Sequence, residues 1–374
     1  MAAIFEATNL SGLELRNRLV RSATWEGLAD DSGRITPQLT RIYEELAEGE
    51  VGLIISSYLY IQAVGKQAVG QIGVDTEASI PGLSTLARVV HARGGKIVGQ
   101  IVHCGGQADR RQNGGLQPMA PSAIESPGYR EVPRELTAHE IDEVIGNFAV
   151  AARRLVEAGF DGVQLHGAHG YLLSQFLSPL RNQRTDAYGG EVQNRSRLCL
   201  EVYRAVRVAV GRSFPIMIKL NANDFMEGST TEEDACLLAS ALADEGIDAI
   251  EVSGGTPGSG KLGAARPNIE APEDEAYFLP QAEAIRRAAP DVPLMLVGGL
   301  RSLEVMERVL EAGTADYFSM SRPLIREPDL PARWQRGDRR RADCVSCLGC
   351  FGPARKGEGI RCVQESQESN DCKN

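Results

Sequence analysis

Two histidines and a tyrosine lie within six residues near the middle of the chain. His166, His169 and Tyr171 follow the apolar run 162–165, which predicts a buried strand. In a β/α repeat, the C-terminal end of a strand is the place where side chains meet a bound ligand. Imidazole and phenol groups there can donate hydrogen bonds, carry protons or bind a metal. The spacing predicts a reaction site, with a zinc site as the alternative for the histidine pair.

The tract that follows is dense in charged and amide side chains. Between positions 181 and 195 it contains Arg181, Asn182, Arg184, Asp186, Asn194 and Arg195, and the turn residues Tyr188-Gly189-Gly190. Few of these residues can belong to an apolar core. The composition therefore predicts a long loop held in place by specific hydrogen bonds.

Four of the eight cysteines are clustered near the C-terminus, at Cys344, Cys347, Cys350 and Cys362. The N-terminus has neither the basic nor the apolar region of a secretory signal, so the cluster indicates a metal site before disulfides. Four thiolates at this spacing suit a [4Fe–4S] cluster or an all-cysteine zinc site. Four unligated thiols in a loose tail are the alternative.

The elements that must position these groups alternate regularly between apolar strands and amphipathic helices. This alternation predicts an α/β protein with a (β/α)8 TIM barrel, and a doubly wound sheet is the alternative. We expect the barrel over residues 1–330 and a short cysteine-rich extension over residues 331–374. The predicted strands begin at residues 19, 51, 96, 162, 216, 249, 294 and 317. No Gly-x-Gly-x-x-Gly motif stands between a strand and a helix, so we expect no dinucleotide-binding domain.

Composition narrows the function classes. The net charge is −10 with no concentrated basic stripe, which argues against nucleic-acid binding. No stretch approaches the length of apolar sequence that a membrane span needs. Together with the missing secretory signal, these features predict a soluble, cytoplasmic enzyme.

The central motif resembles the signature of the Old Yellow Enzyme family, the FMN-dependent ene-reductases. The resemblance is carried by HGAHGYLLSQFLSPLRNQRTDAYGG, which begins at His166, and by the Asn194-Arg195 pair after it. It implies that His166 and His169 hydrogen-bond the carbonyl oxygen of a bound substrate. It also makes Tyr171 the candidate acid for the α-carbon of that substrate.

The resemblance further implies a set of residues around the flavin, each near the end of a predicted strand. Gln100 is a polar residue inside an apolar strand, which a core would otherwise reject. Lys219 stands where the family often has arginine, so positive charge is kept but the planar fork is lost. The residues expected at the ring are Ser22, Ala23, Thr24, Ser57, Gln100, His166 and Lys219, and those expected at the phosphate are Gly298, Gly299, Ser321 and Arg322.

Two features are closer to the branch that contains 2,4-dienoyl-CoA reductase and trimethylamine dehydrogenase. Trp25 follows Ser22-Ala23-Thr24 where small bacterial ene-reductases usually have a cysteine. That branch also carries a four-cysteine [4Fe–4S] motif just after the barrel, at similar spacing. We expect no counterpart of its appended FAD/NAD domain, because a short polar tail follows Cys362. A cluster would then need a separate redox partner or would be structural.

The resemblance therefore implies an NAD(P)H-dependent flavin oxidoreductase that reduces the C=C bond of enones or enoyl thioesters. FMN is the expected cofactor, NADH or NADPH the expected reductant, and a small unsaturated carbonyl compound the expected substrate. Two alternatives stay open: a flavin dehydrogenase that oxidises an amine or alcohol, and a non-catalytic electron-transfer subunit. A homo-oligomer is compatible with the sequence, which selects neither the substrate nor the reductant.

Overall fold

A closed barrel of parallel strands forms the centre of the computed structural model, which describes residues 3–129 and 131–364. Within those residues, eight strands pair in the ring order β10-β11-β12-β3-β4-β5-β8-β9. The (β/α)8 prediction is therefore confirmed. The strands are β3 (Leu19–Arg21), β4 (Leu53–Tyr60), β5 (Ile97–Val102), β8 (Gly162–Gly167), β9 (Ile216–Asn221), β10 (Ala249–Ser253), β11 (Leu294–Val297) and β12 (Tyr317–Met320).

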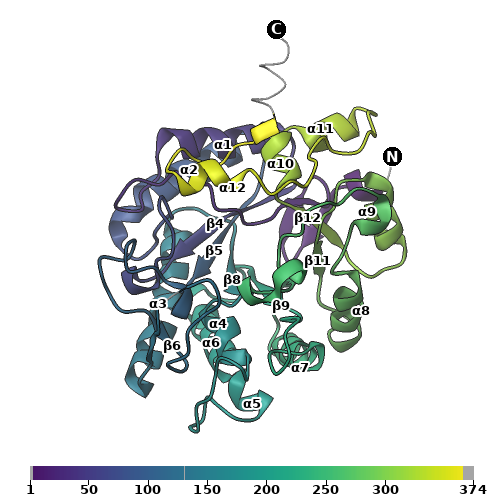
Figure 1. Ribbon diagram of the computed structural model, residues 1–374. Helices are drawn as coiled ribbons and strands as arrows, with labels where there is room; N and C mark the ends of the chain where they lie inside the picture. Colours follow the sequence, from purple (N-terminus) through teal and green to yellow (C-terminus); the bar gives the residue numbers. More distant parts are fainter. Residues whose placement is uncertain (1–2, 130, 365–374) are drawn as a thin grey trace.

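Helices surround the strands on the outside of the barrel (Figure 1). The longer ones are α1 (Pro37–Glu48), α2 (Ile80–Ala92), α3 (Ala138–Glu157), α6 (Arg197–Val210), α7 (Glu232–Asp244), α8 (Leu279–Ala288) and α9 (Leu303–Glu311). Short helices are α4 (Leu172–Leu177), α5 (Val192–Arg195), α10 (Pro323–Arg326), α11 (Leu330–Gln335) and α12 (Phe351–Arg355).

Helix starts follow local capping chemistry. Thr36 accepts a hydrogen bond from the backbone of Leu39 and stands before Pro37, the first residue of α1. Thr137 and Glu140 form a reciprocal capping box at the start of α3. Both starts were predicted from the sequence, because the signals lie within four residues of one another.

The inside of the barrel is layered. The antiparallel hairpin of β1 (Thr8–Leu10) and β2 (Leu13–Leu15) brings three buried leucines against an apolar layer. That layer contains inward side chains such as Val98, Met217 and Met295. Because side chains alternate along a strand, the next inward positions are two residues further on, at Gln100 and Lys219. Apolar packing therefore gives way to polar groups toward the C-terminal ends of the strands.

The chain after β12 returns to the barrel. Trp334 of α11 is buried, and the backbone of Ala332 bonds to Gly49 before β4. Further on, Ile360 donates to the backbone of Glu26 after β3.

The predicted division at residue 330 stays a prediction, and residues 365–374 of the predicted extension lie outside the described residues. Among the described residues, no helix is long and apolar enough to cross a membrane. Two short strands, β6 (Met119–Ala120) and β7 (Arg134–Glu135), pair beside the barrel.

Candidate active site

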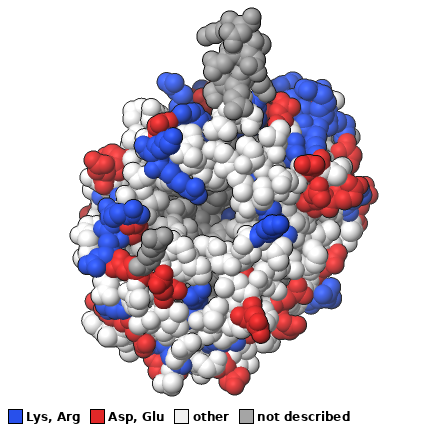
Figure 2. Space-filling view, in the orientation of Figure 1, with Lys and Arg blue, Asp and Glu red and all other residues white. Residues whose placement is uncertain are grey.

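A cleft of about 960 Å³ lies at the C-terminal ends of the barrel strands. Figure 2 shows a hollow in this face with Lys and Arg side chains on its rim. All eight barrel strands, or the loops that directly follow them, contribute lining residues. The predicted site residues that line this cleft are Ser22, Ala23, Thr24, Gln100, His166, His169, Tyr171, Lys219 and Ser321.

The two histidines are neutral hydrogen-bonding groups. Burial lowers the pKa of His166 well below its usual value, and lowers that of His169 to about 3. His166 Nδ1 accepts from the backbone of Ala168 at 3.3 Å, so a neutral ring carries its proton on Nε2. His169 Nε2 lies 2.8 Å from Ser253 Oγ, and the two imidazole rings meet edge to face at 5.1 Å. The pair can donate to a ligand without carrying charge.

Tyr171 stands beside this pair. Its ring meets that of His166 edge to face at 4.7 Å, and its hydroxyl donates to Gln67 Oε1 at 2.9 Å. Burial raises the pKa of Tyr171 well above its usual value near 10. The phenol therefore keeps its proton at neutral pH and faces the cleft as a proton donor.

A buried polar network forms the floor of the cleft. Lys219 Nζ lies 3.3 Å from Glu251 and 2.8 Å from Ser22 Oγ. Gln100 donates to Gln164 at 2.7 Å, and Gln164 donates to Glu251 at 2.9 Å. Glu251 is fully buried, so Lys219 offsets its charge. The network fixes the direction in which the Lys219 and Gln100 side chains face the cleft.

Glu251 and Gln164 were not predicted from the sequence. Both are polar residues inside apolar strands, AIEVS and GVQLH. This is the same signal that singled out Gln100, so applying it to every strand would have found them.

A smaller cavity adjoins the cleft and shares Ser321 and Val297 with it. Arg301, Arg322 and Ser319 also line this cavity. Within the described residues, the buried Ser319 Oγ has no hydrogen-bond partner. Two guanidinium groups and an unpaired hydroxyl form a donor set suited to a phosphate.

Gly299 shapes the wall of this smaller cavity. Its φ is +73°, and a Cβ added there would lie 2.9 Å from the ring of Tyr277. A glycine is therefore required for both conformation and space. A polar cleft next to a phosphate-sized cradle is the arrangement that a flavin mononucleotide needs, so the residues present fit FMN.

Two of the predicted flavin residues line neither cavity. Ser57 and Gly298 are not among the described residues that line the cleft or the smaller cavity. The backbone of Ser57 donates to the Tyr43 hydroxyl at 2.8 Å, in a buried cluster with Glu26. Their roles at a flavin stay predictions.

Several lining residues gave no clear signal in the sequence. Tyr58 lies in β4, whose residues are all buried. No pattern in that strand distinguishes Tyr58, which lines the cleft, from Tyr60, which does not. Gln67 and Tyr129 come from irregular segments, and Phe351 and Arg355 from the C-terminal α12. Periodicity carries no information on how such segments fold back over a barrel mouth.

The four clustered cysteines line one small cavity together with Arg322. Cys350 is buried, Cys344 and Cys362 are half-buried, and Cys347 is exposed. In the part of the chain that the structure describes, however, no group of three or more His, Cys, Asp or Glu side chains is placed to hold a metal ion. The predicted metal centre is therefore not confirmed.

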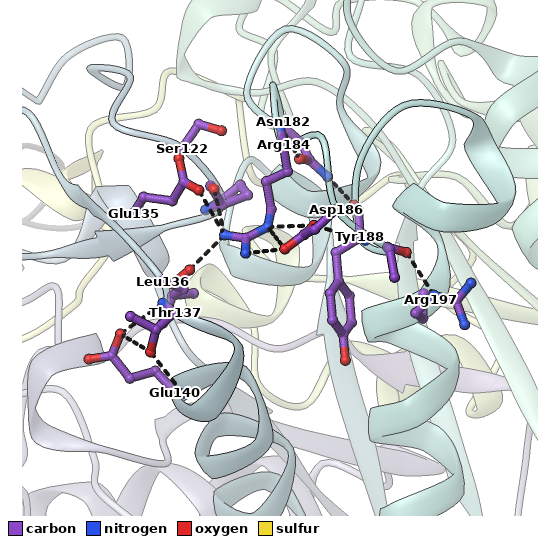
Figure 3. A network of polar contacts seen from close by, with 12 residues as sticks. Ser122, Glu135, Leu136, Thr137, Glu140, Asn182, Arg184, Asp186, Tyr188 and Arg197 are labelled. Atoms are coloured by element: carbon purple, nitrogen blue, oxygen red, sulfur yellow. Dashed lines mark hydrogen bonds and ion pairs between the residues drawn. The ribbon is translucent and has the colours of Figure 1, made fainter.

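Residues 181–191 of the arginine- and asparagine-rich tract form a hydrogen-bonded loop, as predicted (Figure 3), whereas its last residues, Val192–Arg195, form the short helix α5. Arg184 is 8 % exposed and holds Asp186 through two nitrogens. Its remaining nitrogen donates to the backbone of Pro121 and of Leu136, beside the start of α3. Asn182 donates to the backbone of Tyr188 at 2.7 Å. These bonds anchor the segment that follows the active-site histidines.

Comparison with known proteins agrees with the family resemblance of the histidine motif. The model of the NADH:flavin oxidoreductase / NADH oxidase family matches residues 3–340. The chain is 35% identical to an NADH oxidase from Thermoanaerobacter brockii over 354 residues, which cover 93% of this chain and 53% of that protein. It is 32% identical to a 4,4'-dithiodibutanoate disulfide reductase from Rhodococcus erythropolis, with 96% and 94% covered.

A solved complex of 2-naphthoyl-CoA reductase superposes with a TM-score of 0.89 at 30% identity, over 96% of this chain and 56% of that one. The chain thus spans about half the length of several proteins that it matches. The matched region contains the whole barrel and the histidine signature. The chain belongs to the NADH:flavin oxidoreductase / NADH oxidase family, the Old Yellow Enzyme family.

Proposed function

We propose that this protein is an FMN-dependent ene-reductase that reduces the C=C bond of an α,β-unsaturated carbonyl compound. The observation that carries the proposal is one cleft holding two neutral imidazoles and a protonated phenol beside a phosphate-sized cradle. Bound FMN, reduced by NADH or NADPH, would supply a hydride to the β-carbon of the substrate. The residues of the chain then perform the remaining tasks.

The histidine pair would hold the carbonyl oxygen of the substrate. Negative charge develops on that oxygen as the β-carbon gains a hydride, and fixed donors stabilise it most where water is excluded. His166 Nε2 is free of the bond that Nδ1 makes with Ala168, so it can donate to this oxygen. Because both pKa values are lowered, the donors stay neutral across the ordinary pH range.

Tyr171 would supply the proton that completes the reaction at the α-carbon. Its raised pKa keeps it protonated, and the developing enolate is a strong enough base to take that proton. The hydroxyl lies on the same side of the cleft as His166, because the two rings are in contact.

The flavin contacts predicted from the family signature complete the proposal. Lys219 and Gln100 would face the pyrimidine edge of the ring, with Ser22, Ala23 and Thr24 along the other side. The ammonium group of Lys219 favours a reduced, anionic ring, although Glu251 offsets part of its charge. The phosphate would lie against Gly299, Ser321 and Arg322.

One observation favours a second candidate, oxidation of an amine. Aromatic side chains line much of the cleft, and aromatic faces attract ammonium groups: Trp25, Tyr58, Tyr129, Tyr171 and Phe351. The charged side chains argue for the first candidate. Lys219, Arg111 and Arg355 line the described cleft. Lys219 is paired with the buried Glu251 at 3.3 Å and Arg111 with Asp109 at 2.6 Å, which leaves the positive charge of Arg355. A neutral or anionic substrate fits this charge distribution better.

A substrate assay under anaerobic conditions separates the two candidates. The FMN-loaded protein is reduced with one equivalent of NADPH and mixed with 2-cyclohexenone. We expect the flavin to be reoxidised and cyclohexanone to form. Reduction of the resting flavin by dimethylamine or sarcosine, with no response to the enone, would favour the amine dehydrogenase.

The metal centre at Cys344, Cys347, Cys350 and Cys362 is a separate part of the proposal. Its support is the spacing of the thiols and the cavity that they share. We propose residues 331–374 as the extension that carries it, with a [4Fe–4S] cluster ahead of zinc and a redox partner protein as its electron acceptor or donor. Iron, zinc and sulfide analysis of anaerobically purified protein tests this part: about four irons and four sulfides per chain are expected for the cluster.

A further inference from the structure

Two tyrosines share one hydrogen-bond acceptor in the wall of the cleft. Tyr58 donates to Gln67 Oε1 at 3.0 Å, and Tyr171 donates to the same oxygen at 2.9 Å. Their rings are stacked, with centroids 5.7 Å apart and 26° between the planes. The two hydroxyl groups are therefore neighbours. Beside the larger effect of burial, a hydrogen bond between them lowers the pKa of Tyr58 and raises the pKa of Tyr171, so the Tyr171 oxygen is the one of the pair that this bond favours in its protonated form.

The surroundings of this pair disfavour a phenolate. Tyr58 packs in an apolar cluster with Val102, Cys104 and Ala108, against which Tyr171 also packs. Burial raises the pKa of both phenols well above the usual value. Once Tyr171 has given up its proton, its oxygen faces the carbonyl oxygen of Gln67, which accepts hydrogen bonds and cannot donate one. A buried anion without a donor is costly, so the phenolate needs a new hydrogen bond.

The nearest hydroxyl proton belongs to Tyr58. The amide nitrogen of Gln67 is directed away, toward Gln107 Oε1 at 3.5 Å and the Tyr129 hydroxyl. Rotation about one C–O bond turns the Tyr58 proton from Gln67 to the Tyr171 oxygen.

We propose that Tyr58 is a second catalytic residue, which donates to the Tyr171 phenolate and returns a proton to it, and that Gln67 is the positioning residue for both phenols. This inference rests on the proposed ene-reductase function. The O–H bond of Tyr171 breaks as a C–H bond forms at the α-carbon of the substrate. The O–H bond of Tyr58 then breaks as that of Tyr171 re-forms, and solvent water restores the proton of Tyr58. One solvent proton is consumed per turnover, and no further reactant is required.

Gln67 is itself held by a buried amide. Gln71, which is fully buried, accepts from the backbone of Gln67 at 2.8 Å and donates to the backbone of Tyr58 at 3.2 Å. This clamp ties the turn that carries Gln67 to the strand that carries Tyr58. The alignment of the two phenols is thereby built into the fold before any ligand binds.

The test measures reoxidation of the reduced, FMN-loaded protein by 2-cyclohexenone in five variants. Tyr171→Phe should slow this step by roughly 10²- to 10⁴-fold, the range for loss of a general acid. Tyr58→Phe should slow it by roughly 10- to 100-fold, the effect of losing one hydrogen bond to a charged group. The double variant should be no slower than Tyr171→Phe alone, because the two residues act in one relay.

Tyr60→Phe is the matched control. It removes a hydroxyl from the same strand two residues further on, where that group donates to the Ser32 backbone at 3.3 Å and lies outside the cleft lining. We expect a rate within about twofold of the parent protein. Gln67→Leu should lower the rate and leave the dissociation constant for cyclohexanone unchanged, since an aligning group acts on proton transfer and not on ligand binding.

Two results would overturn the inference. One is a Tyr58→Phe rate within about twofold of the parent. The other is an equal slowing by Tyr58→Phe in the presence and in the absence of Tyr171, which would indicate a separate structural effect. Cyclohexanone binding, followed by flavin absorbance, reports whether each variant keeps its folded site. If the parent protein itself fails to transfer a hydride to any enone, it is the proposed function that fails.

Discussion

At the scale of residues, the site combines groups whose protonation is fixed by burial. His166 and His169 are held neutral and Tyr171 is held protonated, so each can offer a hydrogen-bond donor without carrying charge near neutral pH. The residue types at these positions could be predicted from the sequence. Their partners could not, because Ser253 and Gln67 come from a different strand and an irregular segment. Tertiary contacts of that kind leave no periodic signal.

Replacement of His166 by alanine tests the oxyanion role. Loss of one donor to the developing enolate should lower kcat/KM for an enone by roughly 10²- to 10³-fold. His139→Ala is the matched control, because its side chain is 83% exposed on the first turn of α3. Steady-state rates at low enone concentration give the comparison. Equal rates for the two variants would show that His166 does not take part in the reaction.

The low pKa of His169 predicts how stability depends on pH. Its folded pKa of about 3 lies below the unfolded value near 6.5, so the unfolded chain binds the extra proton. Stability from this group is full above pH 6.5 and is lost as the pH falls toward 3. Between pH 7 and pH 5 the loss is about 2 kcal/mol.

His169→Asn removes that contribution, and asparagine tolerates the φ of +61° at this position. Urea unfolding at pH 7 and pH 5 should show a smaller loss for this variant than for the parent. An unchanged difference would mean that His169 is not held neutral in the folded protein.

At the scale of elements, both the strand ends and the loops that follow them contribute side chains to the cleft. The strand positions were predictable, because apolar runs and capping signals are local in the sequence. The hairpin of β1 and β2 was not, since strands of three residues each are too short for a periodic pattern to stand out. In the turn after β11, the conformation depends on one residue type: glycine at position 299 leaves room for the Tyr277 ring.

Gly299→Ala should weaken FMN binding at least tenfold. The added Cβ would meet the Tyr277 ring at 2.9 Å and disturb the cavity proposed for the phosphate. Gly313→Ala is the control, with a similar φ of +70° and no neighbouring atom within 4 Å. Both variants carry the same backbone strain, so their difference isolates the contact. Fluorescence titration of the apoprotein with FMN measures it, and equal affinities would contradict the assignment of this turn.

At the scale of the whole molecule, a barrel and the chain that follows it build one cleft. The barrel was predictable because eight repeats of one pattern reinforce each other. The return of the C-terminal segment was not, since Leu348 and the short helix α12, with Phe351 and Arg355, reach the cleft after a long irregular stretch of chain. This segment brings the four cysteines to a cavity that shares Arg322 with the proposed phosphate site. Any electron transfer between a centre there and the flavin would have a short path.

The central claim is that this cleft delivers a hydride and a proton across an activated C=C bond. The most direct measurement is anaerobic stopped-flow mixing of the NADPH-reduced, FMN-loaded protein with 2-cyclohexenone, followed by product analysis. The account predicts complete flavin reoxidation and one cyclohexanone per flavin. If a series of enones and enoyl thioesters leaves the flavin reduced while dioxygen reoxidises it, the ene-reductase assignment is contradicted.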